Sequence, residues 1–227
     1  MISLKFEKVN SHIVVDHEGL NMLIDTGLMV SIADKPIDFI DRKYSALNSV
    51  MGVNIDMISK LAGFKIDAII GLDILSNYKL RIRWNDGFLD FGQDVPDGKI
   101  VQKLSYDICV IFPIKIDGIK TSGILDTGAS ISYVSDELVK NKTIINQKED
   151  FYPLIGKFTT SIYEIPVSIY GRKTINLEFG ILPGMLKIVH GIVMSSIGIK
   201  AILGTQLLTK YNCTIDWDEE VISWDNV

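Results

Sequence analysis

A five-residue pattern occurs twice in this 227-residue chain, and the repeat constrains the fold more than any other feature. The sequence LIDTG at 23–27 recurs as ILDTG at 124–128, an offset of 101 residues. Each copy closes an apolar run that is typical of a buried strand. Internal similarity of this kind indicates that one structural unit has been used twice.

A longer repeat supports the duplication. IDAIIGLDILSNYKLRIRW at 66–84 recurs as IKAILGTQLLTKYNCTIDW at 199–217. In both halves, Asp-Thr-Gly is followed by a variable segment, an apolar-apolar-Gly strand end, a short helical turn and a strand that closes on Trp. From Asp25 to Gly71 the variable segment spans 46 positions, whereas from Asp126 to Gly204 it spans 78. The second half therefore carries 32 extra residues there.

The local patterns predict an all-β chain with a few short helices. Short β-rich runs are punctuated by Gly, Asp and Asn, which favour turns. The runs lie at 11–15, 66–70, 80–84, 108–116 and 174–179. Helices are expected at 55–62, before Gly63, and at 135–142, after a capping Ser.

The repeat and the composition between its copies define two lobes. Residues 92–99 (GQDVPDGK) are rich in Gly, Pro and Asp and are expected to form a linker. We therefore expect an N-terminal lobe at 1–97 and a C-terminal lobe at 98–227, related by a pseudo-twofold axis. Each lobe would contribute one Asp-Thr-Gly loop to a cleft between them.

Composition excludes several classes of function. Hydrophobic residues make up 47% and charged residues 22%, which is typical of a folded globular chain. A net charge of −5 and a pI near 5.2 argue against nucleic acid as a partner. No apolar run approaches the roughly 18 residues of a membrane helix, and the N-terminus lacks a leader pattern, so a cytoplasmic location is expected. Cys109 and Cys213 are expected to be reduced core residues.

Paired aspartates carry the chemistry that the repeat predicts. A pseudo-twofold axis would bring Asp25 beside Asp126, and two adjacent carboxylates cannot both ionise easily. They then share one proton, so one member can accept a proton from water while the other donates a hydrogen bond to a carbonyl. Gly27 and Gly128 would let the backbone approach and donate hydrogen bonds to the carboxylates.

These paired motifs resemble those of the aspartic peptidases of the pepsin and retropepsin superfamily. The resemblance covers nearly the whole chain and is strongest at 23–32, 66–84, 124–135 and 199–217. It implies a bilobal pepsin/retropepsin-like acid protease fold and water-activating catalysis. It also implies that segments 69–71 and 202–204 pass beneath the active-site loops and support them. By this resemblance, Asp25 and Asp126 would form the catalytic dyad, and Thr26 and Thr127 would cross-link the two loops at the base of the site.

One departure from the family concerns the dyad. Pepsins commonly place a hydroxyl residue just after Asp-Thr-Gly, where it stabilises the ionised carboxylate, but here Leu28 and Ala129 follow. Loss of that donor should raise the carboxylate pKa. We therefore expect activity at mildly acidic rather than strongly acidic pH. The bulkier 28–30 segment, compared with 129–131, indicates either an asymmetric floor or a degenerate first site.

A second departure concerns the hairpin flap that covers the cleft in this family. The first half is too short to hold a flap comfortably, whereas residues 152–166 (YPLIGKFTTSIYEIP) suit a mobile hairpin. Pepsins carry their flap in the amino-terminal half, so its expected place here is reversed. Tyr163 or Phe158 would supply a wall of the substrate pocket, and an ordinary surface hairpin is the alternative. The expected flap residues that contact substrate are Gly156, Lys157, Phe158 and Thr159.

Other candidate groups are expected to be structural. The three histidines are scattered and are expected to be ordinary surface or half-buried residues, and Ser195-Ser196 lacks the context of a catalytic nucleophile. Trp84 and Trp217 are expected to anchor the core. The acidic cluster that follows Trp217 is expected to be a solvated turn. The histidines are His12, His17 and His190, and the acidic cluster is Asp216, Asp218, Glu219 and Glu220.

Together the patterns predict an aspartic endopeptidase that acts on extended, largely apolar peptide segments. No metal or cofactor is expected, and the dyad needs no dimer because both aspartates lie on one chain. One alternative is a non-catalytic module that binds a peptide or protein in the same groove. Another is a dimer in which only one type of Asp loop forms the working dyad.

Overall fold

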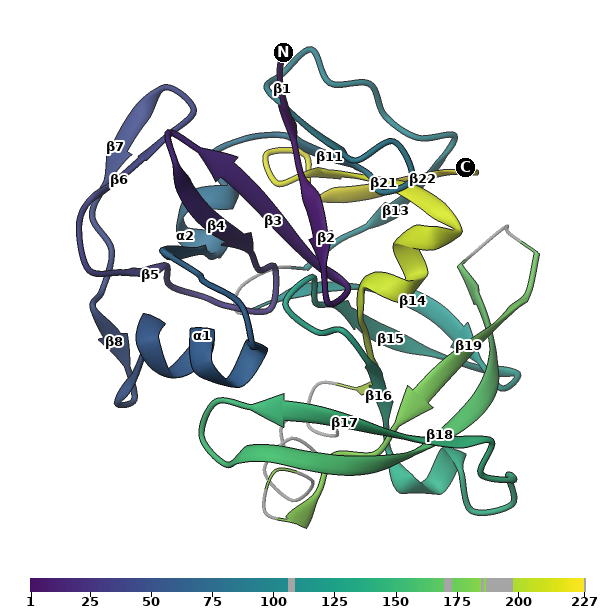
Figure 1. The fold of residues 1–227 in the computed structure, drawn as a ribbon. Coiled ribbons are helices and arrows are strands. Elements are labelled where there is room, and N and C mark those ends of the chain that lie inside the picture. The colour runs from purple at the N-terminus through teal and green to yellow at the C-terminus, as the bar shows by residue number, and fades with distance from the viewer. Residues whose placement is uncertain (106–108, 170–172, 185, 187–197, 227) are drawn as a thin grey trace.

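The computed structural model describes residues 1–105, 109–169, 173–184, 186 and 198–226. Strands dominate, in three larger sheets and two small hairpins (Figure 1). None of the helices in the described part of the chain has the length and apolar character needed to cross a membrane. The expected all-β architecture with short helices is therefore confirmed.

The first half is built on a five-stranded sheet with the order β2-β3-β4-β10-β5. Strand β10 runs parallel to β4 and antiparallel to β5, so an Ala-Ile-Ile run lies in the middle of the sheet and is fully buried. Its strands are β2 (Glu7–Val9), β3 (His12–His17), β4 (Leu20–Ile24), β5 (Ile32–Ala33) and β10 (Ala68–Ile70). Two hairpins, β6 (Ile37–Phe39) with β7 (Arg42–Tyr44) and β8 (Ser49–Val50) with β9 (Val53–Asn54), are attached.

Helix α1 (Ile55–Ala62) lies where the sequence predicts it. The Asn54 side chain accepts a hydrogen bond from the Met57 N–H at 3.0 Å, and Gly63 ends the helix at φ 78°. Its buried face packs into the first-half hydrophobic cluster. The other helix of this half is the short α2 (Leu72–Leu75).

The second half repeats the plan in a seven-stranded sheet with the order β14-β15-β20-β16-β19-β18-β17. Strand β14 also pairs with β18, which closes part of this sheet on itself. The strands are β14 (Val110–Ile116), β15 (Ile119–Leu125), β16 (Ser132–Val134), β17 (Asn146–Tyr152), β18 (Gly156–Ile169), β19 (Ile175–Gly180) and β20 (Ile199–Leu203).

The predicted helix at 135–142 is wrong in type and extent. Only η1 (Asp136–Leu138), a single 3-10 turn, forms there, and Ser135 makes no side-chain capping bond. A segment this short nucleates a helix poorly unless tertiary packing supports it. A second 3-10 helix, η2 (Thr205–Thr209), follows β20 and matches the helical turn expected from the repeat.

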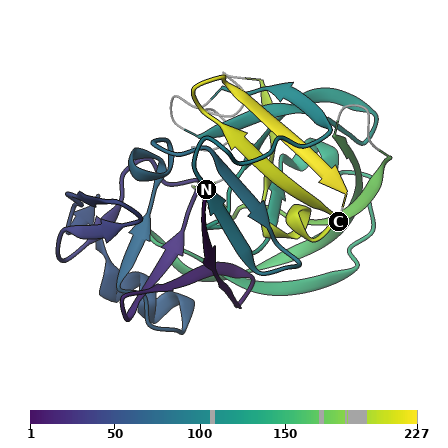
Figure 2. The ribbon, with the colours of Figure 1, turned by 90° about the horizontal axis from the view of Figure 1, so that it is seen from above.

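A six-stranded sheet joins the halves, with the order β1-β12-β11-β21-β22-β13. Figure 2 shows the first-half elements on one side of the molecule and the second-half sheet on the other. Each half supplies three strands, and β11 meets β21 at the centre, where Arg81 pairs with Thr214. These two residues are counterparts in the 66–84 and 199–217 repeat, so the pseudo-twofold axis passes between them. The strands are β1 (Ile2–Lys5), β11 (Leu80–Arg83), β12 (Phe88–Phe91), β13 (Ile100–Lys103), β21 (Tyr211–Asp216) and β22 (Val221–Asn226).

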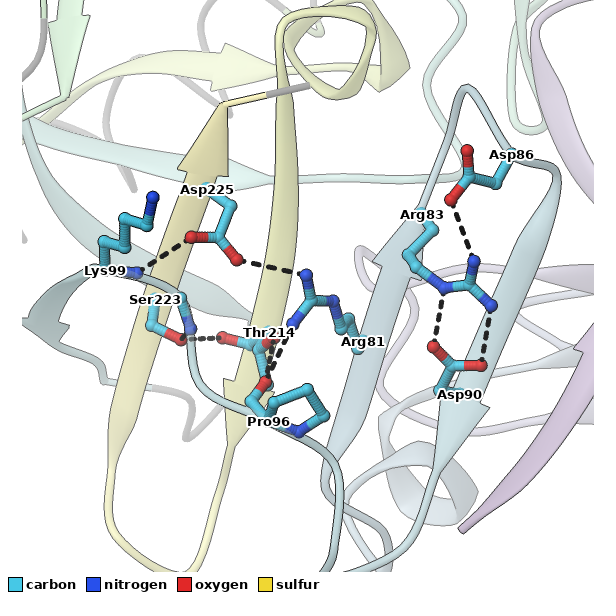
Figure 3. A network of polar contacts seen from close by, with 10 residues as sticks. Arg81, Arg83, Asp86, Asp90, Pro96, Lys99, Thr214, Ser223 and Asp225 are labelled. Atoms are coloured by element: carbon cyan, nitrogen blue, oxygen red, sulfur yellow. Dashed lines mark hydrogen bonds and ion pairs between the residues drawn. The ribbon is translucent and has the colours of Figure 1, made fainter.

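The connection at 92–99 is bound tightly to this sheet (Figure 3). The Pro96 carbonyl accepts hydrogen bonds from Arg81 Nη1 at 3.2 Å and Thr214 Oγ1 at 3.0 Å. Arg81 also pairs with Asp225 at 3.0 Å. A Cβ on Gly98 would lie 2.4 Å from the Trp224 backbone nitrogen, so only glycine fits. The segment is thus a strap across the central sheet.

A buried ion pair also links the halves, and it corrects one expectation. Lys79 lies 3.0 Å from Asp97 and 3.1 Å from Asp216, and both Lys79 and Asp216 are buried. Of the acidic cluster that was expected to be solvated, only residues 218–220 are exposed. Asp216 is buried because it neutralises a lysine that the sheet takes out of water.

The core spans both halves. One large hydrophobic cluster contains residues from each, including the two repeat tryptophans, Trp84 and Trp217, as predicted. The two cysteines are free and buried, as predicted. A separate first-half cluster consists of Val14, Leu23, Ile32, Val53, Ile55, Ile58, Ala62, Ile66 and Ile69, and we call it the first-half wall cluster.

Candidate active site

The two Asp-Thr-Gly loops leave equivalent strands and meet at the pseudo-twofold axis. Asp25 follows β4, and its N–H donates to the Ile70 carbonyl at 3.0 Å. Asp126 follows β15, and its N–H donates to the Leu203 carbonyl at 3.0 Å. The buried apolar strands β10 and β20 thus hold both loops from the side, which is the scaffold role expected for them.

Two threonines connect the loops through four buried hydrogen bonds. Thr26 Oγ1 donates to the Leu125 carbonyl at 2.8 Å and accepts from the Thr127 N–H at 3.0 Å. Thr127 Oγ1 donates to the Ile24 carbonyl at 2.7 Å and accepts from the Thr26 N–H at 3.0 Å. Each threonine hydroxyl therefore makes two bonds to the opposite half. It accepts from a backbone N–H of the opposite loop and donates to a carbonyl at the end of the strand that leads into that loop. This arrangement fixes the two aspartates relative to one another.

The structure brings the two predicted carboxylates together. Asp25 and Asp126 lie within hydrogen-bonding range of each other, and each also accepts from the glycine two residues later, at 2.8 and 2.9 Å. A Cβ on Gly27 would lie 2.4 Å from Asp126 Cγ, and a Cβ on Gly128 would lie 2.4 Å from Asp25 Cγ. Both glycines are thus required by close approach of the opposite carboxyl group.

Burial sets the ionisation of this pair. Desolvation raises the pKa of both Asp25 and Asp126 above the ordinary value of 3.8. The charge of Asp25 raises the pKa of Asp126 further, while backbone N–H donors, including that of Gly27, oppose the increase at Asp25. The donors after the motif are the backbone N–H groups of Leu28 and Ala129 in place of a hydroxyl. Such a pair holds one proton over a pH range above that of a free carboxyl group.

Two serines that sequence reasoning missed lock each loop to its scaffold glycine. Ser31 Oγ accepts from the Gly71 N–H at 2.9 Å, and Ser132 Oγ accepts from the Gly204 N–H at 3.0 Å. These serines are separated by the same 101 residues as the aspartates, so the repeat itself contained the signal. A Cβ on Gly71 would lie 2.7 Å from the carbonyl oxygen of Leu28, which explains the scaffold glycine.

A cavity of about 540 Å³ opens in front of the dyad, and its lining is mostly apolar. The first half supplies one wall, largely from the first-half wall cluster, and the second half supplies the other. Lining residues include Leu23, Ile58, Phe64 and Ile69 from the first half, and Tyr133, Phe158, Leu182 and Ile202 from the second. Besides the dyad, the ionisable carboxyl and imidazole groups of the lining are Asp150 and His12.

His12 is in a place that the sequence did not indicate. The expectation of an ordinary surface or half-buried histidine is wrong, because His12 is 3% exposed and lines the cavity. His17 is half-buried on β3, consistent with a structural role, and His190 and Ser195-Ser196 lie outside the described residues.

The β17–β18 hairpin of the second half covers the cavity. Its strands run over 146–152 and 156–169, so the hairpin is longer than the predicted 152–166 and turns at 153–155. In Figure 1 the hairpin extends towards the part of the first half that carries α1. The Phe151 side chain packs against the first-half wall cluster. The hairpin therefore bridges the two sides of the cleft.

The predicted flap residues divide into two groups. Phe158 lines the cavity. Gly156 lies at the turn with φ 82°, a backbone conformation that would strain any residue with a Cβ atom. Lys157 and Thr159 are exposed and are not among the lining residues. Sequence reasoning missed the lining residues Phe151, Tyr152, Pro153 and Leu154, which precede the predicted set.

A hydrogen bond anchors the hairpin to its own half. Tyr133 Oη on β16 donates to Asp150 Oδ2 on β17, and burial together with this carboxylate raises the pKa of Tyr133. From the first half, the small β8–β9 hairpin contributes Val50, Met51 and Val53 to the lining of the cavity. Met51 at its turn is 81% exposed.

Comparisons with known proteins show the fold. No protein-family model matches the sequence, and no curated protein matches it. An aspartic proteinase from Irpex lacteus is similar in structure over 100% of this chain and 97% of its own, with a TM-score of 0.53 and 12% identity. Two other solved structures align over part of the chain. They are a retropepsin-like aspartic protease from Rickettsia conorii (57% of this chain, 91% of that chain, TM-score 0.39, 17% identity) and the Simian Foamy Virus (mac) protease (41%, 86%, 0.30, 17%). The chain thus has a pepsin/retropepsin-type fold, as the repeated motifs predicted.

Proposed function

We propose that this protein is an aspartic endopeptidase that hydrolyses peptide bonds with water activated between Asp25 and Asp126. The observation that carries the proposal is the pair of buried carboxyl groups, in hydrogen-bonding range and held by symmetric backbone and threonine bonds. Because such a pair holds one proton, it contains a base and an acid at one position.

The proposed reaction needs two proton transfers. The ionised carboxylate takes a proton from a water molecule as the water oxygen attacks the peptide carbonyl carbon. The protonated carboxyl group donates its hydrogen bond to the carbonyl oxygen, which stabilises the developing charge. Collapse of the tetrahedral intermediate returns a proton to the leaving amine, and no covalent enzyme intermediate forms.

The cavity supports extended, largely apolar peptides as substrates. Its two walls are apolar, and a β-hairpin covers it, which can bind an extended peptide through main-chain hydrogen bonds. Both carboxyl groups come from one chain, so a monomer is sufficient for activity.

A peptide library tests the proposal directly. Cleavage is measured by mass spectrometry from pH 3 to 7 for the wild type and for Asp126→Asn, with pepstatin as an inhibitor control. We expect cuts between apolar residues, loss of all cuts in the variant, and a rate maximum at mildly acidic pH, because burial raises both dyad pKa values. A maximum near pH 2 would contradict the ionisation argument. No cleavage by folded wild type would favour the alternative, a groove that binds peptides without cutting them.

A further inference from the structure

His12 introduces a polar group into the apolar first-half wall of the cavity. It begins β3, directly after Asn10 and Ser11, which both adopt positive φ and turn the chain at this point. The imidazole ring lies between two aromatic rings, with centroid distances of 6.0 Å to Phe64 and 6.4 Å to Phe151. Phe151 belongs to the covering hairpin, so the ring lies where the wall meets the cover.

One nitrogen of this ring has no partner. The Gly128 backbone carbonyl lies close enough to the imidazole to favour its protonated form, whereas Nδ1 is buried and unpaired among the described residues. The tautomer that points Nε2–H towards this carbonyl leaves Nδ1 with a free lone pair. An unpaired buried acceptor destabilises the folded state. Buried polar groups nearly always have partners, so an exception that lines a binding cavity indicates a missing ligand group.

Burial favours the neutral form of the ring. Burial lowers the pKa of His12, and this effect exceeds the opposing influence of Asp150 and of the Gly128 carbonyl. Neutral imidazole with a protonated Nε2 offers Nδ1 only as an acceptor. The group that completes this site must therefore donate a hydrogen bond.

The second half has no equivalent acceptor. Val14 pairs with Leu23 in the first half, and Ile111 pairs with Ile124, the counterpart of Leu23, in the second. His12 lies two residues before Val14, and Cys109 lies two residues before Ile111. Cys109 is buried and is not among the residues that line the cavity. The unpaired imidazole acceptor thus has no counterpart at the equivalent position of the second half, although the Asp150 carboxylate of the covering hairpin also lines the cavity.

We propose that His12 is a specificity-determining residue, and that its Nδ1 accepts a hydrogen bond from the phenolic hydroxyl or indole N–H of an aromatic substrate side chain. The aromatic and aliphatic wall around it favours a flat ring, and the unpaired acceptor favours a ring that carries a donor. Gly128, whose carbonyl lies close to the imidazole, follows Asp126 by two residues. The recognised side chain therefore lies next to the cleaved bond. The assignment rests on the proposed peptidase function for its position in the substrate.

Matched peptides that differ only at this residue test the proposal. Tyr, Phe, Trp and Leu versions are compared for the wild type, for His12→Phe, which removes the acceptor, and for His12→Gln, which retains one. Wild type should favour Tyr over Phe by about tenfold in kcat/KM, since a site built for a hydroxyl discriminates against its absence. The Tyr/Phe ratio should approach one in His12→Phe and recover partly in His12→Gln. A Trp preference without a Tyr preference would identify the indole as the donor and support the same acceptor.

A control and a binding measurement separate this proposal from the proposed function. Cys109→Ala changes the equivalent position of the other half and should leave the Tyr/Phe ratio unchanged. If wild type cuts no peptide, the Tyr and Phe peptides are made with a reduced, uncleavable bond, and their Kd values are measured by calorimetry. A Tyr/Phe affinity ratio of about ten that depends on His12 would support the subsite without catalysis. Equal affinities, or an equal ratio in wild type and both His12 variants, would overturn it.

Discussion

The scaffold glycine follows the motif aspartate by 46 positions in the first half and by 78 in the second, yet the two loops have the same geometry. In the first half, the intervening chain forms two small hairpins and α1. In the second, it includes the long β17–β18 hairpin. The loop geometry depends on short contacts with β10 and β20 that recur in both halves. The active-site loop and its cover can therefore vary separately.

Because only the second half carries the long hairpin, the two sides of the cleft have different structural roles. The cover comes from the second half, whereas the wall on which Phe151 rests comes from the first. Under the proposed function, a peptide in the cavity would contact both halves at once. The following changes test where the two halves are equivalent and where they are not.

The largest effect is expected at the dyad, where the halves should be equivalent. Asp25→Asn and Asp126→Asn should each lower kcat/KM by about 10³-fold or more, because either change removes the shared acid and base. Rates are measured on the best peptide from the library, with folding checked by circular dichroism. A variant at one position that remains active would show that only one loop is used.

The threonine cross-link should also be symmetric. Thr26→Val and Thr127→Val each leave two buried backbone groups without a partner and should destabilise the fold by about 3 kcal/mol. Urea unfolding gives the free energy, and exposed Thr174→Val serves as a control with little expected effect. A much larger loss at one threonine would mean that the loops are not held equally.

The covers, by contrast, should be unequal. Phe151→Ala removes the contact between the second-half hairpin and the first-half wall cluster, and should lower kcat/KM about tenfold by misplacing substrate. Met51→Ala, at the tip of the small first-half hairpin, should change it less than about twofold, since this side chain is 81% exposed. Equal losses would mean that the first half has a working cover of its own.

The last prediction concerns the stability of a dyad variant, which should depend on pH. The folded-state pKa of each dyad aspartate is raised, so the folded protein holds more protons and loses stability as pH rises above the ordinary carboxyl value. Asp126→Asn should therefore be more stable than wild type at pH 7 and little changed at pH 4. Thermal unfolding at both pH values measures this. A variant that is less stable than wild type at pH 7 would contradict the desolvation argument.

Sequence alone predicts what depends on local pattern and on the repeat. The Asp-Thr-Gly loops, the scaffold strands and α1, with its Asn54 and Gly63 ends, follow from neighbouring residues. The serines at 31 and 132 were equally accessible, because they repeat at the same offset.

The rest depends on contacts between distant segments. His12 and Phe151 come from opposite halves and pack close together, and no periodicity or motif in the sequence predicts this contact. The burial of Asp216 likewise follows from the position of Lys79 on the other half. The failure at 135–142 shows the converse, since a favourable helix start did not outweigh the surrounding β-structure.

The centre of the six-stranded sheet has the form of an isologous contact. Leu80 pairs with Ile215, and Ile82 pairs with Cys213. In the sequence repeat, Cys213 is the counterpart of Leu80 and Ile215 is the counterpart of Ile82, so the two pairs are related by the pseudo-twofold axis. A residue on the axis of a symmetric homodimer would face its own copy, and two first halves would then place Arg81 against Arg81. Thr214 takes the opposite position here, and Arg81 is free to bind Asp225 and the Pro96 carbonyl. The interface is thus heterotypic, and two first halves paired in the same register would place like charges opposite each other.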